Sequence, residues 1–187
     1  MPALVLAVTV AQLAVAEWWP GIERFAGKAF GARLVAYPVL MLLAPAIWWL
    51  HRRRTRTTEA PPYVAFSLIM LPFLVDVTGN SLDLYDSIVW WDDFNHWINW
   101  LFLLAGIGLL VTRDVHPDWA MVALVTGLGA VLAIAWEVGE WWTFIRHGTE
   151  LGTAYEDTLG DLSLGTLGAT CAGLLLLVRR RAGTTSE

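Results

Sequence analysis

The chain has 187 residues, of which 57% are hydrophobic and only 16% are charged, and it contains 12 tryptophans and one cysteine. Soluble domains are less apolar and carry about a quarter charged residues, so this composition excludes an ordinary soluble protein. A lone cysteine also excludes an internal disulfide. We therefore predict one multi-pass membrane domain covering residues 1–187, a length that suits a single domain.

Six apolar runs are each close to the roughly 20 residues that a helix needs to cross a bilayer. The first run contains Ala14-Val15-Ala16, which resembles a signal-peptidase site but lacks the preceding basic residues of a signal peptide, so retention of this span stays open. The runs predict an all-α integral membrane bundle of about six transmembrane helices, at residues 2–19, 34–51, 63–80, 94–112, 119–142 and 160–178.

The segment between the first two spans, residues 20–34, is too polar to cross the bilayer. Ile22, Phe25, Ala29 and Phe30 recur at helical spacing, and basic residues occupy another face. This pattern predicts an amphipathic helix lying in the outer membrane interface. A solvated loop is the alternative.

The basic residues predict the orientation of the spans. Arginines are concentrated at residues 52–56 and in the tail at residues 179–187, and cytoplasmic loops of membrane proteins carry an excess of Lys and Arg. Six spans with both termini in the cytoplasm place eight of the 12 Lys and Arg residues inside. The four that remain outside are Arg24, Lys28, Arg33 and Arg146.

The fourth and fifth spans carry polar residues at their predicted outer ends. Asp92 and His96 share one helical stripe, and Asp93 lies three residues before His96. Glu137 and Glu140 are three residues apart, and Glu137 lies roughly 27 Å along the fifth span, which enters from the inside. The polar residues at the start of the fourth span and the two glutamates of the fifth span are therefore predicted to lie at the same membrane depth.

The sixth span begins with a third acidic pair. Asp157 and Asp161 are four residues apart, on a stripe that continues with Gly165, Ala169 and Gly173. Small residues mark contacts between membrane helices because they let backbones approach closely, and lipid-facing carboxylates are costly. We therefore predict that the acidic faces line a common interior. The stripe below Glu137 and Glu140 carries the small residues Ala133, Ala130 and Thr126.

Several carboxylates around one histidine cannot all stay ionised in a partly dry pocket unless they share protons or hold a cation. Inward-facing carboxylate and histidine pairs in helix bundles are a known way to build metal sites. Helix caps and solvated rim carboxylates are the alternatives. We predict that the cluster binds a divalent ion, which is Mg²⁺, Mn²⁺, Fe²⁺ or Zn²⁺. The predicted ligands are Asp93, His96, Glu137, Glu140, Asp157 and Asp161.

Three motifs together resemble those of the YjdF-like family of small bacterial inner-membrane proteins. The motifs are Asp92-Asp93-x-x-His96-Trp97, Glu137-x-x-Glu140-Trp141, and Leu151-Gly152-Thr153 followed by Asp157-Thr158-x-x-Asp161. A fainter likeness runs to VanZ-like membrane proteins, which also have an Asp-x-x-His helix start. The resemblance implies a bacterial inner-membrane location and a shared site, and it names no reaction.

The predicted site favours a metal-dependent hydrolase or transferase that acts on a lipid-linked or anionic substrate at the outer leaflet. Glu140 or Asp161 would serve as the general base. Arg24, Lys28 and Arg146 are predicted to bind the anionic group of the substrate.

Two other functions stay open. A cation or proton transporter needs ionisable or polar residues at depth, for which Gln12 and Asp76 are the only candidates. A non-enzymatic membrane partner would use the metal structurally. The expected partner is the lipid bilayer, with no nucleic acid, while the substrate and the oligomeric state stay open.

Overall fold

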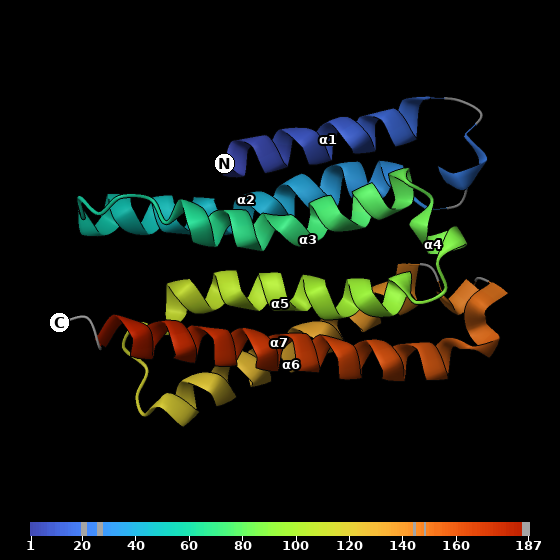
Figure 1. Cartoon of the computed structure of the whole chain (residues 1–187). Coiled ribbons are helices and arrows are strands. Elements are labelled where there is room, and N and C mark those ends of the chain that lie inside the picture. The colour runs from blue at the N-terminus through green and yellow to red at the C-terminus, as the bar shows by residue number, and fades with distance from the viewer. Residues whose placement is uncertain (20–21, 26–27, 144, 148, 185–187) are drawn as a thin grey trace. The chain divides into compact units, whose positions relative to one another are not determined.

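The computed structural model describes the chain except for residues 20–21, 26–27, 144, 148 and 185–187 (Figure 1). The described residues contain helices and no strand, which confirms the all-α prediction. The seven α-helices are α1 (Pro2–Trp18), α2 (Phe30–Thr55), α3 (Tyr63–Ser81), α4 (Leu84–Ser87), α5 (Trp91–Val111), α6 (Asp118–Thr143) and α7 (Ala154–Thr184). Three short 3-10 helices are η1 (Glu23–Phe25), η2 (Ile145–His147) and η3 (Thr149–Gly152).

Five of these helices, α2, α3, α5, α6 and α7, are long and apolar enough to cross a bilayer. The sixth predicted span corresponds to α7, which begins earlier than expected, so that Asp157 lies inside the helix. The first corresponds to α1, a shorter apolar helix of 17 residues, at the lower limit of crossing length. The chain is therefore an integral, multi-pass membrane protein.

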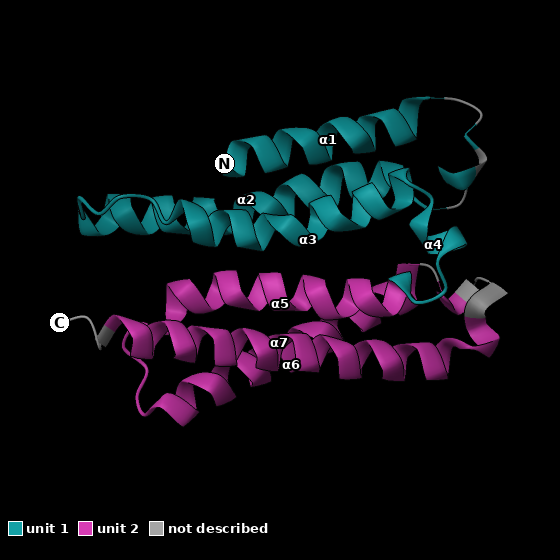
Figure 2. Cartoon of the chain, in the orientation of Figure 1, with its two compact units in different colours: residues 1–91 teal, residues 92–187 magenta. Residues whose placement is uncertain are grey.

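The chain divides into two compact units, residues 1–91 and residues 92–187 (Figure 2). In unit 1, helix α1 packs against α2 and α3 and contributes Leu13, which is fully buried, to a core with Tyr37 and Val77. In unit 2, helix α7 packs along α6. The division does not test whether residues 1–187 are one domain, which stays a prediction.

The single amphipathic helix predicted over residues 20–34 is wrong for the described part of that segment, which leaves out residues 20–21 and 26–27. Phe25 ends the short helix η1, and α2 begins only at Phe30, after a left-handed residue, Ala29 (φ 51°, ψ 41°). The two phenylalanine rings pack edge to face with 5.1 Å between centroids, and both are buried in the core of unit 1. They are therefore core residues and not the lipid-facing side of an interfacial helix.

Asp76 of α3 is the centre of a polar network in unit 1. Its carboxylate accepts hydrogen bonds from Arg33 at 2.9 Å, from the Tyr37 hydroxyl at 2.5 Å and from the Tyr85 hydroxyl at 2.8 Å. Its side chain is only 17% exposed. The network joins α2, α3 and α4, so Asp76, the deep carboxylate considered for transport, is already paired and hydrogen-bonded.

The three helices of unit 2 approach closely through small residues. A methyl group at Gly168 of α7 would collide with the Trp97 carbonyl oxygen of α5, and one at Gly129 of α6 would collide with the Ala169 side chain of α7. Gly173 likewise lies against the backbone of Val122 in α6. These contacts confirm that the small-residue stripe of the sixth span packs against neighbouring helices.

The same contacts define the direction of each helix. Trp97 and Gly108 of α5 lie beside Gly168 and Leu176 of α7, so α5 and α7 run in the same direction. Along α6 the order is reversed, since Gly129 meets Ala169 and Val122 meets Gly173. The starts of α5 and α7 and the end of α6 therefore lie at one end of unit 2, as Figure 1 shows for α5 and α7.

Candidate metal centre

The acidic residues occupy different positions in their helices. Asp92 and Asp93 lie in the first turn of α5 and Asp157 in the first turn of α7, where carboxylates are favoured by the positive end of the helix dipole. Glu137 and Glu140 lie near the C-terminal end of α6, where the dipole disfavours them and the last turn carries no basic residue. Helix capping therefore does not explain the glutamates of α6.

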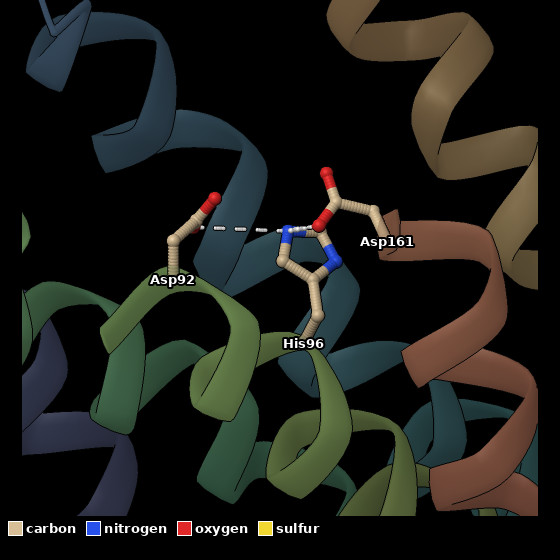
Figure 3. Close-up of side chains that lie close together, drawn as sticks. All are labelled: Asp92, His96 and Asp161. Carbon is tan, nitrogen blue, oxygen red and sulfur yellow. Dashed lines mark ion pairs between the residues drawn. The ribbon is translucent and has the colours of Figure 1, made fainter. Parts of the chain in front are cut away.

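His96 is the central side chain of the cluster. Its Nε2 atom lies 3.5 Å from a carboxylate oxygen of Asp161 and 3.9 Å from one of Asp92, which is one helical turn earlier in α5 (Figure 3). The side chains of His96 and Asp161 are 11% and 5% exposed. Two helices thus bring a buried carboxylate and an imidazole together beneath a more exposed carboxylate.

The potential ligand atoms form two groups that share His96. One group consists of Asp92, His96 and Asp161, and the other consists of His96, Glu137 and Glu140. Within each group one ligand atom per residue lies within 4.8 Å of the others. Oxygen ligands with one imidazole suit a hard or borderline divalent ion, so this cluster could hold a metal ion.

Glu137 has a feature that its neighbours do not explain. The residue is only 7% exposed, and although Thr158 of α7 is a hydrogen-bonding neighbour of its carboxylate, the Oε2 atom is buried without a hydrogen-bond partner among the described residues. A buried carboxylate oxygen that accepts no hydrogen bond is costly and rare in folded proteins. An ion bound beside His96 and Glu140 would supply the missing interaction.

Negative charge is concentrated around Asp161. The carboxylates of Asp92, Glu137, Glu140 and Asp157 are all close enough to interact with it electrostatically, and Asp93 interacts in the same way with Asp157. Like charges at such separations destabilise one another unless protons or a cation compensate them. The structure thus brings all three acidic pairs of the sequence to one end of unit 2.

The six predicted ligands do not all have equivalent positions. His96, Glu137, Glu140 and Asp161 belong to the two potential ligand groups, whereas Asp93 and Asp157 are exposed and lie outside both. Asp92, which was not a predicted ligand, lies next to His96. The signal for Asp92 was its spacing of four residues from His96, which places both side chains on one helix face.

The predicted substrate-binding residues are in both units. In unit 1, Lys28 forms an ion pair with Asp86 at 2.7 Å, and Arg24 lies over the Phe25 ring at 5.3 Å. In unit 2, the half-buried guanidinium of Arg146 lies 4.1 Å from the centre of the Trp142 ring. Their assignment to substrate binding stays a prediction.

Comparison with known proteins gives a match along almost the whole chain. The model of a family described as a predicted membrane protein, DUF2238, matches residues 3–182. The chain matches no curated protein and no solved structure. The family match agrees with the helices described above and assigns no role to any residue.

Proposed function

Because the chain belongs to DUF2238, a family of predicted membrane proteins, we propose that it is a multi-pass protein of the bacterial cytoplasmic membrane whose acidic cluster binds a divalent metal ion at the outer face. The likeness to YjdF-like proteins supports the choice of membrane, and the distribution of Lys and Arg supports the outward orientation of the cluster.

The observation that carries this proposal is the unsatisfied carboxylate oxygen of Glu137. It is buried in the ligand group that also contains His96 and Glu140. We assign these three residues as the protein ligands of the ion. Asp161 and Asp92, whose carboxylate oxygens lie 3.5 Å and 3.9 Å from His96 Nε2, orient His96 in the manner that second carboxylates orient metal-binding histidines.

The proposed activity is hydrolysis or group transfer on a lipid-linked or anionic substrate at the outer leaflet. A bound divalent ion would lower the pKa of water and polarise a phosphoryl or acyl oxygen. Asp161, which lies outside the assigned ligand group, accepts the proton of the attacking water. Arg146 belongs to the same unit and is assigned to hold the anionic group.

Metal content and calorimetric titration of the detergent-purified protein test the metal site. The parent protein is expected to hold one divalent ion, and H96A and E137Q should each lower its affinity about 10–100-fold. E156Q is the matched control, because Glu156 is an exposed carboxylate at the start of α7 outside both ligand groups. The metal proposal fails if the parent holds no stoichiometric ion and none raises its melting temperature.

Two further measurements separate the alternatives. Metal-dependent turnover of a lipid-linked substrate distinguishes the proposed enzyme from a protein that uses the ion structurally. Metal or proton flux into proteoliposomes would instead indicate a transporter. The paired and hydrogen-bonded carboxylate of Asp76 argues against a pathway through unit 1.

A further inference from the structure

A second polar site lies at the other end of unit 2, roughly 24 Å along α5 from His96. It is a pocket of about 250 Å³ between the C-terminal turns of α5 and α7 and the start of α6. Three arginines line it, Arg113, Arg179 and Arg180, together with the apolar side chains of Leu109, Met121 and Leu176. No carboxylate is among the described lining residues, so the positive charge of the arginines is not neutralised within the lining. The pocket therefore combines positive charge with apolar side chains.

Arg180 has a structural role in this pocket. Its guanidinium donates hydrogen bonds to the carbonyl oxygens of Thr112, at 2.5 Å, and Val115, at 2.9 Å. It also pairs with Asp118 at 3.5 Å, and Arg181 pairs with the same carboxylate at 3.1 Å. These contacts compensate the negative end of the α5 dipole, which would otherwise repel an anion.

Arg179 differs from its neighbour. It is exposed, and it makes no hydrogen bond or ion pair with the described part of the chain. Arg179 and Arg113 both line the pocket, and its other described lining residues are Arg180, Thr112 and the three apolar side chains. Arginine binds phosphate through paired N–H groups, and its charge persists at every physiological pH.

We propose that this pocket binds a phosphate group, and that its source is the headgroup of an anionic glycerophospholipid. The helices that form the pocket have membrane-crossing length, so their ends lie in the headgroup layer. The exposed Trp119 at the start of α6 fits the same layer. Leu109, Met121 and Leu176 would contact the apolar part of the lipid while the arginines hold the phosphate.

Native mass spectrometry of the delipidated, detergent-solubilised full chain measures the binding. Phosphatidylglycerol should bind at least about tenfold more tightly than phosphatidylcholine, and the double variant R113Q/R179Q should lose most of that preference. R54Q/R56Q is the matched control, because it also removes two exposed arginines, but these belong to unit 1 and are not among the described residues that line the pocket. The single variant R179E should abolish the preference even if the double variant folds poorly.

Four outcomes decide the proposal. Equal binding of the two lipids, or equal losses in R113Q/R179Q and R54Q/R56Q, would overturn it. Displacement of phosphatidylglycerol by millimolar inorganic phosphate would support recognition of the phosphate group. Binding of inorganic phosphate without any binding of the lipid would overturn the lipid as the occupant. The described lining of the pocket shares no residue with the two ligand groups of the metal centre, so the outcome of this test does not depend on whether a metal ion binds there.

Discussion

At the residue scale, the start of α5 presents two adjacent aspartates with different surroundings. Asp92 lies on the same face as His96 and 3.9 Å from its imidazole, whereas Asp93 is exposed and outside both ligand groups. Sequence spacing alone did not distinguish them, because spacings of three and four residues both bring helical side chains together, and the predicted ligand was Asp93. The tertiary structure distinguishes the two, because Asp92 forms a ligand group with His96 and with Asp161 of α7, whereas Asp93 does not.

This difference leads to a paired prediction. Asp92→Asn should weaken metal binding about tenfold, because it removes a carboxylate that orients His96, while Asp93→Asn should change the affinity less than about twofold. Calorimetric titration of both variants under the same conditions measures the contrast. A larger loss of metal affinity in D93N than in D92N would instead support Asp93 as a ligand.

Asp76 leads to a second residue-scale prediction, which concerns stability. Asp76→Asn removes the charge that pairs with the half-buried guanidinium of Arg33 and weakens the hydrogen bonds from the two tyrosine hydroxyls, so the free energy of unfolding should fall by about 1–3 kcal/mol. Asp86→Asn should cost at most about 1 kcal/mol, because its ion pair with Lys28 is largely exposed. Thermal unfolding of the two variants in one detergent gives the comparison, and equal stability of D76N and the parent would contradict the proposed importance of the network.

At the element scale, the packing of α5 on α7 holds the metal centre together. Gly168 of α7 lies against the backbone of Trp97, which directly follows His96, so any added side chain must push α5 away. The acidic residues contribute charge, but this contact sets how closely the imidazole approaches Asp161. A glycine about two helical turns after Asp161 in α7 therefore controls the geometry of the site.

Gly168→Ala should lower both the melting temperature and the metal affinity, because its methyl group collides with rigid backbone. Gly127→Ala is the matched control in α6, since a methyl group there meets nothing within 4 Å and alanine favours a helix. Differential scanning fluorimetry with and without metal measures both effects. If G168A matched G127A in melting temperature and in metal affinity, the close α5–α7 contact would not be needed.

At the scale of the whole molecule, the orientation in the membrane follows from the charge distribution. With both termini in the cytoplasm, a cysteine replacing Thr55 should resist an impermeant thiol reagent in intact cells, and one replacing Thr149 should react. The native Cys171 is replaced in both variants, so that the introduced cysteine is the only thiol that can react with the reagent. The reverse labelling pattern would move the metal centre to the cytoplasmic side.

The membrane class, the all-α fold and the common depth of the three acidic pairs could be predicted from the sequence. Each of these follows from a local property: the length of an apolar run, the periodicity of a helix, or the position of a residue along it. Helix ends were predicted less well, because they depend on contacts. The start of α2 at Phe30, for example, accompanies the burial of Phe25 and Phe30 in the core of unit 1.

Which of the charged residues contact one another depends on the tertiary structure. Asp76, Asp92 and Asp161 are all aspartates in or beside apolar spans, and local sequence does not distinguish them. Asp76 is paired with Arg33, whereas Asp92 and Asp161 surround His96. The arginine-lined pocket could not be predicted from the sequence either, because Arg113 lies in the turn after α5 whereas Arg179 belongs to α7. Local periodicity determines the face on which a side chain lies, but the packing of one helix on another determines what that face contacts.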